Sequence, residues 1–297
     1  MARLHHARGL QPCALAAHRH RSHAPPCARD GALVCRGGAV TAPTTWVLLR
    51  GLTREARHWG AFPDLLRGHL RAGTRVVALD LPGNGALNAM ASPSSIEATA
   101  QACRARLQAL GVPPPYAVVA MSLGAMVAVE WALQHPAELR CAVLVNTSLR
   151  PFSPWYQRLR PRSYGALLRV ALTAQPARLQ EAAVLALTTR HPPQPAAVLD
   201  RWTALRESRP VTRANALRQL AAAMRYRAPQ RAPLVPMLAV ASAADSLVDP
   251  RCTRRLAALW ALPLREHPSA GHDLPLDDGP WLAAVVGRWA AQRLGDC

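Results

Sequence analysis

The chain has 297 residues, half of them apolar, and a formal net charge of +19. This length and apolar content suffice for one large domain with a core, or for one domain that carries an insertion. No uncharged apolar run reaches the roughly 18 residues that a membrane-spanning helix needs. The seven cysteines are odd in number and form no C-x-x-C pair. We therefore expect a reducing, cytoplasmic setting and neither a disulfide framework nor a zinc site.

Positive charge is unevenly distributed along the chain. All 36 basic residues are arginine, a bias that codon usage in a GC-rich genome would explain. Residues 150–232, however, contain fifteen arginines and only three acidic residues, a net charge of +12. An excess concentrated in one segment is harder to attribute to codon usage alone, and it favours acidic partners.

Residues 1–42 differ in composition from the rest of the chain. They hold five of the eleven histidines and three of the seven cysteines, and they show little periodicity. We expect a disordered basic tail, or one translated from a start placed too early. Two alternatives stay open, a transit peptide and a metal site at His18, His20 and His23.

Apolar runs of strand length begin at residue 45 and alternate with helical patterns. The runs cover residues 45–49, 75–79, 116–120, 141–145 and 236–240. They are apolar on both faces, as the strands of a buried parallel sheet are. We therefore predict an α/β fold in which a mostly parallel central sheet carries helices on both faces.

Helix boundaries and an insertion follow from the same pattern. Ser94 or Ser95 can cap a helix that ends near Leu110, and a second helix is predicted over residues 123–135. Residues 150–232 interrupt the alternation with a helical, proline-punctuated pattern that contains no convincing strand. The predicted organisation is a core of residues 43–149 and 233–297 with a helical cap inserted at 150–232.

Ser122 lies where a predicted strand runs directly into a predicted helix, in the stretch Val118–Ala128. A serine on such a turn is held in a strained conformation with its hydroxyl above the sheet. The turn leaves no room for large side chains two residues before or after the serine, and Ala120 and Gly124 meet that need. The helix N-terminus also favours developing negative charge. An ordinary small-residue turn is the alternative interpretation.

A carboxylate and a histidine follow Ser122 in the order that this kind of site requires. Asp245 comes just after a predicted buried strand, where ligand sites of parallel sheets lie, and His272 lies on a glycine-flanked loop. A neutral imidazole can remove the serine proton, and a buried carboxylate orients the imidazole. Asp249 is the rival candidate for the acid, but Asp245 lies nearer the strand end.

The loop after the first predicted strand supplies a candidate for oxyanion binding. Acyl transfer creates an oxyanion that two backbone N–H groups should receive. We predict that Leu123 and Leu52 provide them, with Gly51 allowing the backbone to turn towards the site. A simple glycine turn is the alternative interpretation of Gly51.

From about residue 44 to 295 the chain resembles the α/β-hydrolase superfamily. Arg50-Gly51 stands where many members have His-Gly, residues 80–85 resemble the common D-x-P-G-x-G loop, and residues 271–278 resemble the histidine segment of small bacterial hydrolases such as pimeloyl-carrier-protein methyl esterase. The resemblance implies an eight-stranded sheet with a helical cap after the sixth strand. Members with a serine nucleophile are mostly esterases, thioesterases, lipases, C–C hydrolases or cofactor-free haloperoxidases, whereas those that cleave halides or epoxides use an aspartate, so Ser122 argues against both of these.

These observations together predict a serine hydrolase that cleaves a carboxylic ester through an acyl-enzyme intermediate, without metal or organic cofactor. Thioester or carrier-linked acyl substrates stay open, as does a non-catalytic binding protein on the same scaffold. No nucleic-acid-binding motif accompanies the arginines, so we expect no specific nucleic-acid partner.

The arginine-rich segment suggests an anionic substrate, such as an acyl group on an acidic carrier protein or on coenzyme A. Arginine binds phosphate and carboxylate with a planar fork. The candidate contacts are Arg158, Arg160, Arg162, Arg225 and Arg227. The alternative is codon usage combined with a solvated helix face.

Overall fold

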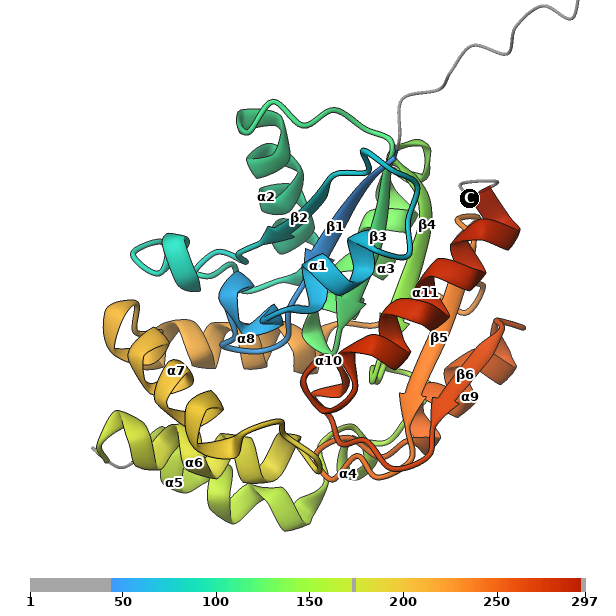
Figure 1. Cartoon of the computed structure of the whole chain (residues 1–297). Coiled ribbons are helices and arrows are strands. Elements are labelled where there is room, and N and C mark those ends of the chain that lie inside the picture. Colours follow the sequence, from blue (N-terminus) through green and yellow to red (C-terminus); the bar gives the residue numbers. More distant parts are fainter. Residues whose placement is uncertain (1–43, 173–174, 295–297) are drawn as a thin grey trace, which may run out of the picture. The chain divides into compact units, whose positions relative to one another are not determined.

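The computed structural model describes residues 44–172 and 175–294, so the predicted tail at 1–42 lies outside the described residues. The core of the described part is a six-stranded sheet in the order β2-β1-β3-β4-β5-β6 (Figure 1). All neighbouring strands of this sheet pair in parallel. The strands are β1 (Thr45–Leu49), β2 (Val76–Leu79), β3 (Tyr116–Met121), β4 (Leu139–Val145), β5 (Met237–Ser242) and β6 (Leu264–His267).

Each central strand contributes alternate side chains to two separate apolar cores. In β3, Val118 and Ala120 pack into the core on one face, whereas Val119 and Met121 pack into the core on the other. Successive side chains of a strand point to opposite faces, so a strand covered on both sides must be apolar throughout. This is why the central strands are unbroken apolar runs.

Helices cover both faces of the sheet, as predicted. Residues of α2, α3 and α9 line one core, and residues of α1 and α11 line the other. These helices are α1 (Phe62–Arg67), α2 (Ile96–Ala109), α3 (Leu123–Gln134), α9 (Arg251–Leu259) and α11 (Gly279–Leu294), with α10 (Leu274–Asp277) before the last; the short 3-10 helices are η1 (Ala56–Trp59), η2 (Gly85–Leu87) and η3 (Pro136–Glu138). Ser95 caps α2 by accepting a hydrogen bond from Ala98 N at 3.1 Å.

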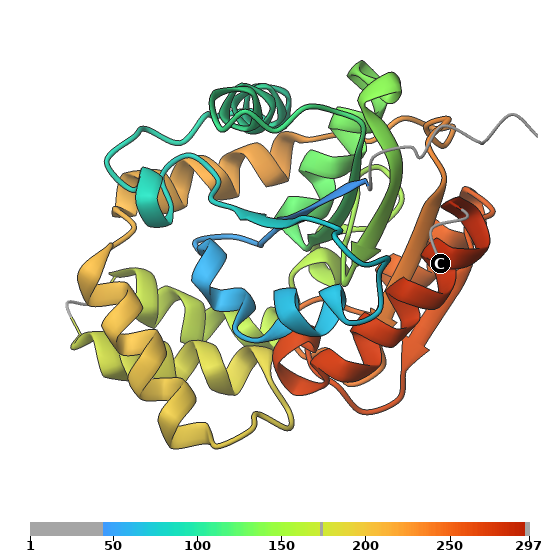
Figure 2. The ribbon, with the colours of Figure 1, turned by 45° about the horizontal axis from the view of Figure 1, so that its top comes forward.

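The segment between β4 and β5 is helical and lies beyond the C-terminal ends of the strands (Figures 1 and 2). We call it the helical insertion. Its elements are α4 (Trp155–Arg158), η4 (Pro161–Ser163), α5 (Tyr164–Leu172), α6 (Ala177–Thr188), α7 (Pro195–Ser208) and α8 (Arg213–Arg225). A small apolar cluster that contains the buried Trp202 joins α6 to α7, and Leu276 of α10 packs against it.

Two expectations about the sheet need correction. The eight strands implied by the resemblance are not found, since residues 44–172 and 175–294 form six, and the insertion follows the fourth of them. The sixth strand, Leu264–His267, has no counterpart among the predicted runs. It pairs only with β5 at the sheet edge, and its exposed Arg265 and Glu266 mean that it does not form an apolar run in the sequence. Among the described residues, no helix combines the length and apolarity needed to cross a membrane.

Candidate active site

Ser122 occupies a strained backbone position between β3 and α3. Its φ is 54° and its ψ is −116°, a region that non-glycine residues rarely adopt. Ser122 N donates to Val145 O at the end of the neighbouring strand β4, at 3.0 Å. The turn is therefore tied to the sheet, and it leads at once into α3 with Leu123 at its first position.

Close backbone packing explains the small residues around this turn. A Cβ on Gly124 would lie 2.6 Å from both Leu49 O and Arg50 O, and a Cβ on Gly51 would lie 3.2 Å from Ser122 Cβ. Ala120 is fully buried. The chain after β1 therefore passes directly against the serine turn, which brings Gly51 and its neighbour Leu52 next to the predicted nucleophile.

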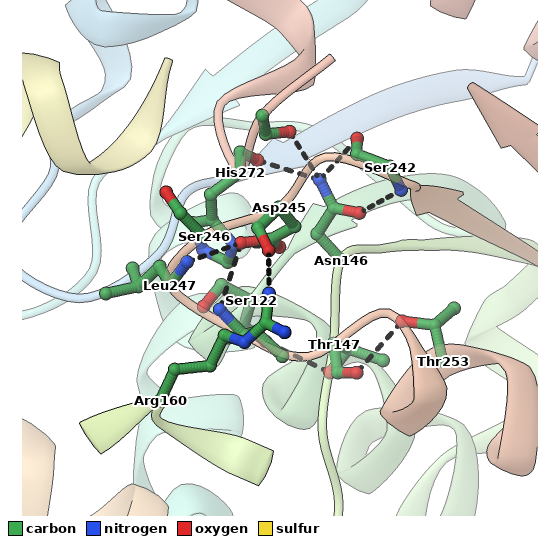
Figure 3. A network of polar contacts seen from close by, with 12 residues as sticks. Ser122, Asn146, Thr147, Arg160, Ser242, Asp245, Ser246, Leu247, Thr253 and His272 are labelled. Atoms are coloured by element: carbon green, nitrogen blue, oxygen red, sulfur yellow. Dashed lines mark hydrogen bonds and ion pairs between the residues drawn. The ribbon is translucent and has the colours of Figure 1, made fainter. Parts of the chain in front are cut away.

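Asp245 and His272 meet in a buried hydrogen bond. His272 Nδ1 lies 2.7 Å from Asp245 Oδ2, and both residues are less than 5% exposed. The other carboxylate oxygen, Oδ1, accepts from the backbone N–H groups of Leu247 and Val248 at 2.8 and 2.9 Å. These three donors hold the carboxylate in one orientation, and Figure 3 draws the pair together with Ser122.

The rival acid Asp249 is committed to a different partner. Its carboxylate accepts from Arg251 at N, Nε and Nη2, at 3.0, 3.1 and 2.7 Å. The hydrogen bonds from Arg251 lower the Asp249 pKa below its usual value. Of the two carboxylates considered from the sequence, Asp245 is therefore the one that faces His272.

Asn146 is a structural element of the site that the sequence reasoning missed. It follows β4 with a φ of 47°. Its Nδ2 donates to His272 O at 2.8 Å and to Ser242 Oγ at 2.9 Å, and its Oδ1 accepts from Ser242 N at 2.8 Å. One side chain thus joins the histidine loop to the end of β5 (Figure 3). Its position at a strand's C-terminal end was the available signal, because Ser122 and Asp245 occupy equivalent positions.

The loop that carries Leu52 is held by polar side chains from two directions. Gln219 of α8 accepts from Thr53 N at 2.9 Å and donates to Asn84 Oδ1 at 2.7 Å. Asn84 in turn donates to Arg54 O at 3.0 Å, and Asp80 accepts from Ala56 N at 2.6 Å. The loop that resembles D-x-P-G-x-G therefore fixes the backbone that would present the oxyanion donor.

A buried ion pair connects this loop to the histidine loop. Arg50 Nη1 and Nη2 donate to Asp273 Oδ1 and Oδ2 at 3.0 and 2.6 Å, and the side chains are 2% and 3% exposed. The guanidinium also lies over the Trp59 ring, 5.0 Å from its centroid. Since Arg50 precedes Gly51 and Asp273 follows His272, the pair joins the loop that passes against Ser122 to the loop that carries His272.

A second buried cluster joins the core to the helical insertion. Arg54 Nη1 donates to Glu181 Oε2 of α6 at 2.7 Å, and Arg206 Nε of α7 donates to Glu181 Oε1 at 2.6 Å. Arg54 also lies over the Trp202 ring, 4.2 Å from its centroid. Burial lowers the pKa of neighbouring His58 well below its usual value, and the positive charges of Arg54 and Arg50 add to the effect.

Three of the five arginines predicted to contact an anionic substrate donate to carbonyl groups within the protein. Arg158 donates to Ala223 O at 2.7 Å, Arg160 to Asp245 O at 2.8 Å and Arg162 to Ser246 O at 3.3 Å. The bonds from Arg160 and Arg162 fasten the insertion to the loop that carries Asp245, and the bond from Arg158 joins α4 to α8 within the insertion. Arg225 and Arg227 are exposed at the end of α8.

Several solved structures of other proteins are similar to this chain. Similar structures include the esterase RhEst1 from Rhodococcus sp. ECU1013, with a TM-score of 0.67, 20% identity and coverage of 85% of this chain and 92% of that chain. A thermophilic esterase from Thermogutta terrifontis has a TM-score of 0.65 and 18% identity, with coverage of 84% of this chain and 90% of that chain. A hydrolase from Pseudomonas aeruginosa PA01 has a TM-score of 0.64 and 21% identity, with coverage of 86% of this chain and 91% of that chain. No curated protein matches the chain in sequence.

The sequence profile of the alpha/beta hydrolase family matches residues 46–285. This range covers the helical insertion and all six strands apart from Thr45, and it contains Ser122, Asp245 and His272. The chain therefore belongs to the alpha/beta hydrolase family.

Proposed function

We propose that the protein is a serine hydrolase that cleaves a carboxylic ester through an acyl-enzyme intermediate. The observation that carries the proposal is the buried 2.7 Å contact between His272 Nδ1 and Asp245 Oδ2, beside a serine whose φ of 54° lifts it out of the strand. A carboxylate at Nδ1 keeps the proton on that nitrogen and leaves Nε2 free to accept the serine proton. Family membership supports the same reaction class.

In this mechanism Ser122 Oγ attacks the ester carbonyl while His272 takes up its proton. Asp245 stabilises the imidazolium that forms, and His272 then gives the proton to the leaving alcohol. Water then attacks the acyl-enzyme while His272 again takes up the proton, and the carboxylic acid is released as the proton returns to Ser122 Oγ. No direct hydrogen bond joins Ser122 Oγ to His272 within residues 44–172 and 175–294, and we expect it to form when substrate closes the site.

The backbone amides of Leu52 and Leu123 are the proposed oxyanion donors. Leu123 is the first residue of α3, where helical N–H groups have no intrahelical partner. Leu52 follows Gly51, which approaches Ser122 Cβ and Oγ. The bonds from Gln219 and Asn84 keep this loop in place before the charge develops, which is the condition for effective electrostatic stabilisation.

The proposal is tested with a panel of p-nitrophenyl esters of increasing acyl length and with a fluorophosphonate probe. The parent protein should hydrolyse at least one ester and should be labelled at Ser122. Ser122→Ala should lose both labelling and turnover, whereas Ser148→Ala, which removes another buried hydroxyl after β4, should retain labelling. Unchanged turnover in Ser122→Ala would refute the assignment.

A second candidate substrate class is an acyl group on an acidic carrier protein or coenzyme A. It is favoured by the exposed Arg225 and Arg227 and by the +12 charge of the proposed cap, residues 150–232. Increasing salt should then lower kcat/KM for an anionic ester steeply and for a neutral ester little. An equal response of both esters would eliminate this candidate.

We also propose a cytoplasmic location. Cys103 and Cys252 are buried thiols without a disulfide, which fits a reducing compartment. Burial raises the pKa of Cys103 to about 12, so this thiol is unreactive in the folded protein.

A further inference from the structure

Helix α8 has its polarity reversed relative to an ordinary surface helix. Its buried face carries Asn215 and Gln219, which are 3% and 5% exposed, together with the small apolar Ala222. Its solvent face carries Leu217, Leu220 and Met224, which are 64%, 37% and 60% exposed. The usual arrangement places the apolar stripe towards the core and the polar residues towards water. Large apolar side chains exposed together at spacings of three and four residues form a stripe, and such a stripe is a candidate interaction surface.

The buried polar face explains why the helix is oriented in this way. Gln219 bonds Thr53 N and Asn84 Oδ1, and Asn215 accepts from Ser92 N at 2.9 Å and donates to Met90 O at 2.9 Å. These bonds would be lost if α8 rotated to bury its leucines. The same bonds connect α8 to the loop that carries Leu52.

Every charged residue within α8 is positive, although burial raises the pKa of Tyr226, which follows the helix, and Glu130 and Glu97 lie close enough to add to that rise. Arg213, Arg218 and Arg225 flank the apolar stripe and are exposed, and residues 208–244 contain no acidic residue. Helix α4 adjoins the C-terminal end of α8 through the bond from Arg158 to Ala223 O. It exposes 68% of Trp155, and the segment 150–176 around it also lacks acidic residues.

We propose that this face of α8, formed by Leu217, Leu220 and Met224 with their flanking arginines, docks the protein on an anionic lipid surface. A helix with leucine and methionine between arginines matches the pattern of interfacial helices, in which apolar side chains enter the acyl boundary and guanidinium groups bind phosphate. Each arginine near an anionic bilayer adds further attraction.

Charge distinguishes this occupant from a second copy of the chain. Two α8 faces brought together would oppose the arginines of one helix to those of the other, and neither helix carries an acidic side chain of its own. An acidic protein would satisfy the charge, but it would also need a complementary surface of several hundred Å². A bilayer needs only a projecting stripe, and its anionic headgroups supply the charge.

The test is flotation of the full chain with vesicles of phosphatidylcholine, with and without phosphatidylglycerol, at low and high salt. The parent should float with the anionic vesicles, and Leu217→Gln/Met224→Gln should lower its partition coefficient about tenfold or more, because two exposed side chains no longer enter the acyl region. Leu259→Gln, which changes a leucine of α9 that is 58% exposed, is the matched control and should bind as the parent does.

A second variant changes the charge and leaves the stripe intact. Arg213→Gln/Arg218→Gln/Arg225→Gln should lower binding to anionic vesicles and reduce its salt dependence. Circular dichroism should show that the variants keep the parent fold. Vesicle binding is measured without turnover, so its outcome is independent of the proposed ester hydrolysis.

Three results would overturn the proposal. The first is vesicle binding by Leu217→Gln/Met224→Gln at the parent level, which would mean that charge alone attracts the protein. The second is a parent dimer that this variant converts to a monomer in analytical ultracentrifugation, which would assign the face to a second copy. The third is a parent protein that does not bind vesicles but binds an acidic carrier protein, with that binding weakened in Leu217→Gln/Met224→Gln.

Discussion

The buried pair between Arg50 and Asp273 should be one of the most sensitive points of the molecule. The two side chains are 2% and 3% exposed and share two hydrogen bonds of 3.0 and 2.6 Å. Asp273→Asn preserves the volume but leaves the Arg50 charge buried beside a neutral amide. Removing one partner of such a pair costs about 3–5 kcal/mol, a large fraction of the stability of a typical domain.

Urea unfolding of parent and variants measures this cost. Asp64→Asn is the matched control, since it breaks a pair with Arg67 in which the aspartate is 74% exposed, and it should cost less than about 1 kcal/mol. Replacing both buried partners, by Arg50→Met with Asp273→Leu, should recover much of the loss because no unpaired charge remains.

Activity should fall together with stability, because the pair joins the loop of Leu52 to the loop of His272. In folded Asp273→Asn we expect kcat for the best p-nitrophenyl ester to fall by about 10- to 100-fold, up to the scale of losing one oxyanion donor. The reasoning is refuted if Asp273→Asn costs no more stability than Asp64→Asn. It also fails if the variant with both Arg50→Met and Asp273→Leu is less stable than Asp273→Asn.

Three further predictions follow from individual contacts. Gly124→Ala should lower the free energy of unfolding by about 1–3 kcal/mol, because the added Cβ would lie 2.6 Å from two backbone oxygens. Gly165→Ala in α5 should be neutral or stabilising, because a Cβ at Gly165 would have no heavy atom within 4 Å. Equal stability of the two variants in urea unfolding would contradict this. Asp245→Asn should lower kcat by about 10⁴-fold, as expected when the imidazole loses its orienting carboxylate, and a loss below tenfold would remove Asp245 from the site. Burial keeps the His58 pKa well below 6.5, so the unfolded chain binds a proton that the folded chain does not as pH falls below about 6.5. The free energy of unfolding should then fall by up to about 1.4 kcal/mol per pH unit more in the parent than in His58→Gln, and parallel pH profiles of the two would exclude this contribution.

The central part of the fold was predictable because its physical cause is local. Strands buried on both faces must be apolar, so β1, β3, β4 and β5 stand out as runs. The edge strand β6 was missed because side chains on both of its faces reach water: the consecutive residues Arg265 and Glu266 are both exposed.

The candidate site was predictable only in part. Ser122, Asp245 and His272 each follow a recognisable local pattern, and the structure brings Asp245 and His272 into contact. The roles of Asn146 and Asp273 could not be predicted from their own positions, because their partners lie 96–126 and 223 residues away.

Composition and periodicity therefore determined the alternation of strands and helices, the position of the serine turn and the arginine-rich insertion. Only the tertiary structure decided what the arginines do. Arg160 and Arg162 donate to carbonyl groups, Arg54 is buried against Glu181, and the arginines of α8 remain exposed around an apolar stripe. The net charge of a segment is a sum that can be read from the sequence. The effect of each charged side chain depends on its burial and on its nearest partner, and both are set by segments far apart in the chain.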